Sequence, residues 1–168
     1  KYGPNDIEKG VELLQSSDKL IGHNIIGFDI PVLKKLKGVD LYDKKLVDTL
    51  VLSRLFNPTR EGNHSLESWG YRLNHNKIEF EEFKEYSEDM LNYCENDVLL
   101  NYKIYQHLKT ESKGFTKQSV EIEHKVAKIL NDQREKGFYF DIKNASILLA
   151  ELKSKIHLYS SSVNLVDL

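Results

Sequence analysis

A single helix-forming run in the middle of the chain constrains the fold more than any other feature. Ser87 is placed to cap this run, two acidic residues follow in the favoured first turn, and helical spacing continues to about Leu108. One face of the predicted helix carries six residues: Met90, Tyr93, Asp97, Leu100, Ile104 and Leu108. Asp97 is therefore expected to point inward among aliphatic side chains, where a carboxylate requires a partner or a metal ion.

Short strands and helices are predicted to alternate upstream of this run. Residues 19–23 indicate a short buried strand that ends at Asn24. Asp29 then opens a helix that Gly38 can end, and a second strand-favouring run begins at Leu46. Asp29 follows a strand, so it can bring a second carboxylate to the cleft expected beside the long helix.

The remaining helices are predicted from caps and spacing. One begins at Asn5 or Asp6 and runs to about Gln15, and Ser65 can cap a short helix through Trp69. After a break at Gly114, an amphipathic helix is expected to end at Gly137, with an apolar face of Ile122, Val126, Ile129 and Leu130. Asp141 can cap a last helix, whose apolar residues are Ile147, Leu148, Leu152 and Ile156.

Composition excludes several classes of protein. The chain has 168 residues, of which 40% are hydrophobic, enough for one substantial core. No apolar stretch approaches the roughly 20 residues of a membrane span, and no signal-peptide pattern is present. The single cysteine, Cys94, cannot form an internal disulfide and fits a reducing compartment. The net charge of −2 argues against binding nucleic acid through many phosphate contacts, but not against a nuclease whose carboxylates hold cations.

Tyr93, Asp97 and Asp29 together predict metal-assisted hydrolysis of phosphodiesters. Tyr93 and Asp97 lie on one helix face, so a phenol and a carboxylate can point into the same cleft. Asp29 and Asp97 can bind hard divalent cations, and Tyr93 can orient a water molecule. The Tyr-x-x-x-Asp pattern alone is a weak signal, and a half-buried packing tyrosine is the alternative for Tyr93.

Four segments, taken in order, resemble a known family. They are Leu20-Ile-Gly-His-Asn-Ile-Ile-Gly-Phe-Asp, Val47-Asp-Thr-Leu-Val-Leu-Ser-Arg-Leu, His64-Ser-Leu-Glu-Ser-Trp-Gly-Tyr-Arg-Leu, and the stretch from Val120 to Asp141. With Tyr93 and Asp97, they are similar to the second and third motifs of DEDD exonucleases that carry tyrosine in the third motif. The closest resemblance is to the proofreading domain of phage family A DNA polymerases of the T-seven type.

The resemblance implies roles for particular residues. Asp29 and Asp97 would be metal-binding and catalytic carboxylates, in a site for two Mg²⁺ or Mn²⁺ ions, and Tyr93 would help orient the attacking water. Asn24 and Phe28 would lie beside the 3′ end of single-stranded DNA. Asp48 and His64 lie in segments typical of the family, but no step of the reaction is assigned to either residue. Bracing of the following helix is favoured over catalysis for Asp48.

One motif of the family is missing from its expected place. Asp-x-Glu on an opening strand would supply two further carboxylates, and Asp6-Ile7-Glu8 fits that pattern only superficially. This stretch follows Pro4 and begins a helical run, so Asp6 and Glu8 are not expected to be ligands. The site is therefore expected to be incomplete, with weak or no activity in the chain alone, and one edge and one apolar face of the sheet are expected to be uncovered.

The predicted fold class is α/β, a ribonuclease-H-like exonuclease fold truncated at its N-terminus and followed by helices that lead into a polymerase domain. Residues 1–112 would form the partial exonuclease domain, 113–118 a linker and 119–168 the helical start of the polymerase region. The chain would be a fragment of a longer polymerase, or a subunit of a split polymerase completed by another chain.

The predicted function is 3′→5′ proofreading in DNA replication, in the cytoplasm of a bacterial or phage-infected cell. The partners would be a single-stranded DNA 3′ end and the remainder of the polymerase, with no membrane. Two alternatives stay open: a catalytically inert structural or single-strand-binding module of a polymerase, and an RNA-trimming nuclease of the DEDD type.

Overall fold

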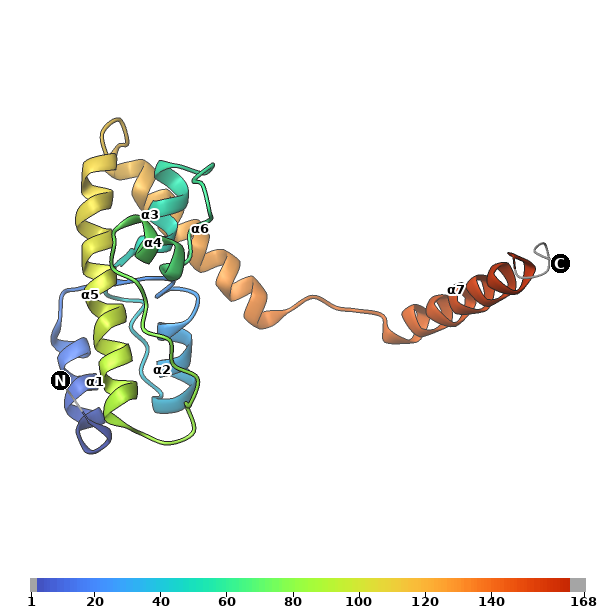
Figure 1. The fold of residues 1–168 in the computed structure, drawn as a ribbon, viewed down its shortest axis with the longest axis horizontal. Helices are drawn as coiled ribbons and strands as arrows, with labels where there is room; N and C mark the ends of the chain where they lie inside the picture. Colours follow the sequence, from blue (N-terminus) through green and yellow to red (C-terminus); the bar gives the residue numbers. More distant parts are fainter. Residues whose placement is uncertain (1–2, 164–168) are drawn as a thin grey trace. The chain divides into compact units, whose positions relative to one another are not determined.

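The computed structural model describes residues 3–163, which form two units, one ending at Asp132 and the other beginning at Gln133 (Figure 1). The elements in chain order are η1 (Pro4–Asp6), α1 (Ile7–Ser16), β1 (Lys19–Gly22), α2 (Asp29–Lys37), β2 (Lys45–Asp48), α3 (Thr49–Phe56), α4 (Leu66–Arg72), α5 (Glu88–Glu111), α6 (Lys117–Lys136) and α7 (Ile142–Val163). Residues 164–168 of the predicted polymerase region lie outside the described residues. A mainly helical chain with a small parallel sheet confirms the predicted α/β class.

β1 and β2 form a parallel pair whose carboxyl ends lie side by side. Leu20 pairs with Leu46, and Gly22 pairs with Asp48 at the ends of the strands. A Cβ at Gly22 would lie 2.6 Å from the Cβ of Ile25, so the chain can turn closely here only with glycine. Among the described residues the sheet has two strands, so each strand has one edge without a neighbouring strand.

The turn after β1 and helix α2 form the first part of the core. Leu20, Ile25, Ile26, Ile30 and Leu41 are buried together. α2 ends where the sequence predicts, because Gly38 adopts a left-handed conformation (φ 68°) and its N–H donates to the carbonyl of Lys34. This core fixes the position of Asp29 at the start of α2.

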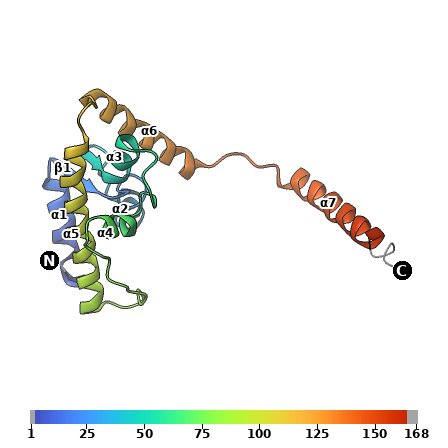
Figure 2. The same ribbon diagram turned by 45° about the horizontal axis from the view of Figure 1, so that its top comes forward.

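The second part of the core lies where α5 packs against α3 and α4 (Figure 2). Ser87 caps α5 through the N–H of Met90. The predicted stripe is confirmed in its C-terminal half, where Leu100, Ile104 and Leu108 are fully buried beside Trp69 and Leu52. α4 begins after the predicted cap Ser65 and extends beyond Trp69 to Arg72.

An ion pair joins the end of α5 to the loop that follows α3. Arg60 Nη1 donates to Glu111 Oε1 at 3.0 Å, and the Arg60 guanidinium lies 4.4 Å from the centre of the Trp69 ring. The hydrogen bond from Arg60 holds the pKa of Glu111 below its ordinary value, against a smaller opposing effect of burial.

Glu111→Gln is expected to lower the free energy of unfolding by about 1–2 kcal/mol at pH 7. Since the pKa of Glu111 is lower in the folded chain than in the unfolded chain, this contribution is complete above about pH 5. It disappears as the pH falls through the folded pKa. Urea unfolding between pH 7 and pH 3, with exposed Glu85→Gln as the control, should show the difference between variant and parent shrinking with pH. A difference that stays constant with pH would contradict this prediction.

Within the first unit, α6 packs on the core through a face that its apolar pattern does not predict. The backbone N–H of Asp48 donates to His124 Nε2 at 2.9 Å, and Asn131 Nδ2 donates to the hydroxyl of Tyr42 at 3.1 Å. The helix is confirmed, but the expected apolar residues Ile122, Val126, Ile129 and Leu130 are exposed. The face that packs on the core carries His124 and Asn131, which make these hydrogen bonds, and the partly buried Val120 and Ala127. Polar contacts and small apolar contacts together determine how the helix packs.

The second unit contains α7, which Asp141 caps as predicted, since its Oδ1 accepts from the N–H of Asn144 at 3.0 Å. Ile147, Leu148, Leu152 and Ile156 are exposed within the described residues. A search of the described helices finds none with the length and apolar character needed to cross a membrane.

Candidate active site

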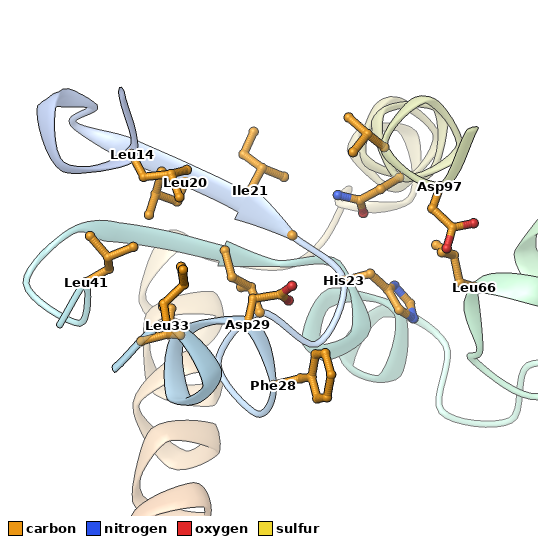
Figure 3. Close-up of a pocket in the computed structure, with 15 residues that line it drawn as sticks. Leu14, Leu20, Ile21, His23, Phe28, Asp29, Leu33, Leu41, Leu66 and Asp97 are labelled. Carbon is orange, nitrogen blue, oxygen red and sulfur yellow. The ribbon is translucent and has the colours of Figure 1, made fainter. Parts of the chain in front are cut away.

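A pocket of about 450 Å³ extends along β1 to the carboxyl end of the strand and the turn that follows it. Open parallel sheets bind ligands at this edge, because the loops after the strands and the starts of the following helices converge there. Both predicted carboxylates, Asp29 and Asp97, line the pocket, together with His23, Phe28 and Asn101. Figure 3 shows Asp29 reaching in from the start of α2 and Asp97 from α5, with His23 between them in this view.

Asp29 lies in the first turn of α2, where a negative charge is favoured. The residue as a whole is exposed, but nearby protein atoms displace water from its carboxyl group. This partial burial raises the pKa of Asp29 above its ordinary value, and the negative charge of Asp48 adds to the effect. A cation at the pocket would stabilise the ionised form that burial disfavours.

Asp97 is half-buried, and its two oxygens differ in their surroundings. Oδ2 lies 3.3 Å from the Nζ of Lys77. Oδ1 is buried, and the described residues offer it no hydrogen-bond partner. A buried carboxylate oxygen without a partner is energetically costly, so Oδ1 is suited to accept a ligand.

Tyr93 is connected to Asp97 through Lys77 rather than through the pocket. Lys77 Nζ donates to the Tyr93 hydroxyl at 3.0 Å, and Tyr93 is not among the residues that line the pocket. Its ring packs against Phe80 and Phe83, with centroids at 5.8 and 5.7 Å. Burial alone lowers the pKa of Lys77, but the hydrogen bond to Tyr93 and the charge of Asp97 outweigh it, so this pKa lies above its ordinary value.

Asp48 braces the turn between β1 and α2. It is 1% exposed and accepts three backbone hydrogen bonds, from the N–H groups of Asn24 (2.9 Å), Ile26 (3.1 Å) and Leu50 (2.9 Å). The last of these caps α3, which confirms the bracing role predicted for Asp48. Asn24 itself adopts a left-handed conformation (φ 63°) in this turn, its side chain lies close to Gly27, and it does not line the pocket.

The other residues singled out from the sequence fall into three places. Phe28 lies at the pocket and is 61% exposed, which leaves its ring available for stacking. His64 neighbours the pocket residue His23 without lining the pocket; its Nδ1 lies 2.8 Å from the Ser53 hydroxyl, and that hydroxyl accepts a hydrogen bond from the indole of Trp69. Asp6 and Glu8 lie at the start of α1, in the helical run predicted there; neither lines the pocket, and both pair with lysines.

Two residues of the site were missed by sequence reasoning. His23 lines the pocket, and burial lowers its pKa; its Nδ1 lies 2.9 Å from the hydroxyl of Thr49. Its position directly after a predicted strand could have signalled this placement. Lys77 comes from an irregular segment with no periodic pattern, so nothing in the sequence marked it.

Asp29 and Asp97 fit part of a binding site for a hard divalent cation. Both residues line one pocket, and Mg²⁺ and Mn²⁺ prefer carboxylate oxygens as ligands. In residues 3–163, however, no group of three or more His, Cys, Asp or Glu side chains converges to hold a metal ion. The described residues therefore account for part of a ligand set.

Comparisons with known proteins agree with this chemistry. The model of a 3′-5′ exonuclease family matches residues 4–113, which include the whole pocket. The chain is 26% identical over 216 residues to the DNA-directed DNA polymerase of Enterobacteria phage T3, and equally to that of Escherichia phage T7. Each match covers 92% of this chain and 31% of the polymerase, so the chain spans about a third of the length of these curated relatives. Exonucleases of this kind generally use divalent metal ions. A family match that covers well over half of the residues, with both pocket carboxylates inside it, establishes that the chain belongs to the 3′-5′ exonuclease family.

Proposed function

We propose that this chain provides the 3′→5′ proofreading exonuclease of a DNA-directed DNA polymerase, removing 3′-terminal nucleotides by hydrolysis with Mg²⁺ or Mn²⁺ during DNA replication. The observation that carries the proposal is the convergence of Asp29 and Asp97 on one pocket within the family match. The match to an exonuclease family does not favour the alternative of an inert module.

In this proposal each residue of the site has a separate role. Asp29 and Asp97 would hold divalent cations, which activate water and stabilise the leaving oxygen when bound. Tyr93 would orient the attacking water through its hydroxyl oxygen. The exposed ring of Phe28 would stack on the terminal base of a single strand, and Asn24 would support the same 3′ end.

The wider setting belongs to the same proposal. We infer that the chain adopts a ribonuclease-H-like fold. We also infer that the remainder of a polymerase is its partner, either in the same chain or as a second subunit, and that it acts in the cytoplasm of a bacterial or infected cell. The support is the identity to two phage polymerases together with the parallel strand pair and the pocket at its carboxyl end.

Nucleotide release from single-stranded DNA tests the proposal. With 3′-labelled DNA and Mn²⁺, we expect slow release of the terminal mononucleotide by the chain, because the described residues supply few carboxylates. EDTA should abolish the release, and RNA of the same sequence should be cut more slowly. DNA binding without EDTA-sensitive release would favour a single-strand-binding module, and faster cutting of RNA would favour an RNA-trimming nuclease.

A further inference from the structure

The irregular segment between α4 and α5 lies over the face of α5 that carries Tyr93 and Asp97. The contacts at the start of this segment are polar. Asn96 Nδ2 of α5 donates to the carbonyl of Asn76 at 3.2 Å, and Lys77, the next residue of the segment, also contacts α5 through its side chain. Further along, Phe80 and Phe83 pack on the Tyr93 ring and on each other, with centroids 4.9 Å apart. We refer to residues 77–83 as the strap.

The ammonium group of Lys77 joins the strap to both predicted site residues of α5. Lys77 Nζ lies 3.0 Å from the Tyr93 hydroxyl and 3.3 Å from Asp97 Oδ2, and the side chain is only 27% exposed. It therefore supplies the positive charge that the half-buried Asp97 carboxylate requires.

A divalent cation on Asp97 would change this arrangement. The cation and the ammonium group would both be drawn to one half-buried carboxylate, and two positive charges at such short range repel each other. Oδ1 is buried without a hydrogen-bond partner among the described residues, and Oδ2 already faces the ammonium group of Lys77, so a cation that binds Asp97 has to compete with Lys77 for this carboxylate.

We propose that Lys77 is an exchangeable counter-ion of the site. Its ammonium group links the strap to Tyr93 and Asp97, and it leaves Asp97 when a divalent cation binds, which loosens the strap and frees the Tyr93 hydroxyl. Lys77 is thus a positioning residue that competes with the metal. This inference rests on the proposed role of Asp97 as a metal ligand.

Mn²⁺ binding to the whole chain tests the competition without any need for activity. Free Mn²⁺ is measured by electron paramagnetic resonance during titration of the parent chain, Lys77→Met and the control Lys84→Met, an exposed lysine of the same irregular segment. Lys77→Met keeps the alkyl chain and removes the charge, so it should bind Mn²⁺ about 3- to 10-fold more tightly. Lys77→Arg and Lys84→Met should stay within about twofold of the parent.

Hydrogen exchange followed by mass spectrometry tests the loosening in the unmodified chain, so the result does not depend on a variant folding. Mn²⁺ should speed amide exchange in residues 77–83 of the parent, while in Lys77→Met exchange should be fast already without metal. Equal Mn²⁺ affinity of parent and Lys77→Met would overturn the inference, as would unchanged exchange on Mn²⁺ binding or no binding by either chain. Failure of the proposed function has a different signature: tighter binding by Lys77→Met together with nucleotide release that does not depend on Asp97.

Discussion

Asp97→Asn is expected to reduce metal-dependent release of 3′-terminal nucleotides by at least about 10²- to 10³-fold. The amide keeps the size of the side chain but loses the charge that a divalent cation requires. The substitution also replaces one carboxylate oxygen with an NH₂ group, which cannot bind a cation. The measurement is the initial rate of mononucleotide release from 3′-labelled single-stranded DNA at several Mn²⁺ concentrations.

A matched control separates this effect from a general effect of charge on α5. Asp89 is an exposed aspartate in the first turn of the same helix, so Asp89→Asn removes one charge from α5 without touching the pocket. Its release rate should stay within about twofold of the parent. Asp29→Asn should behave like Asp97→Asn. Release by Asp97→Asn at close to the parent rate would remove Asp97 from the catalytic site.

Asp48→Ala is expected to lower the free energy of unfolding by about 3 kcal/mol, a large share of the total stability of a domain of this size. The substitution leaves three backbone N–H groups without their acceptor, two in the turn after β1 and one at the start of α3. It removes a helix cap as well, which alone contributes about 1 kcal/mol. Urea unfolding followed by circular dichroism, with the slope compared between variants, measures the loss.

The control for Asp48→Ala is Asp40→Ala. Asp40 also accepts a backbone hydrogen bond, from the N–H of Tyr42 at 3.0 Å, and pairs with Lys34, but it is exposed. Water can replace both contacts, so the expected loss is about 0.5–1 kcal/mol. Equal losses for the two variants would show that the burial of Asp48 is unimportant, and that the turn after β1 is held by its apolar contacts.

Local patterns were sufficient to predict the elements that carry the site. The cap at Ser87 and the apolar spacing of Leu100, Ile104 and Leu108 identified α5, and Gly38 marked the end of α2. These signals operate within a few residues, through backbone hydrogen bonds and helical periodicity, so they do not depend on the rest of the fold. They also brought Asp29 and Asp97 into consideration together, and the structure places both at one pocket.

The contacts that hold the site together could be found only in three dimensions. Lys77 meets Tyr93 and Asp97 from a segment without periodicity, and Asp48 accepts hydrogen bonds from a turn that precedes it by many residues. α6 shows the same limit, because its apolar spacing predicted one buried face while His124 and Asn131 turn another toward the core. Each of these contacts joins residues distant in sequence. Their geometry depends on how whole helices and strands pack against each other, so the residue spacing within a single element cannot predict them.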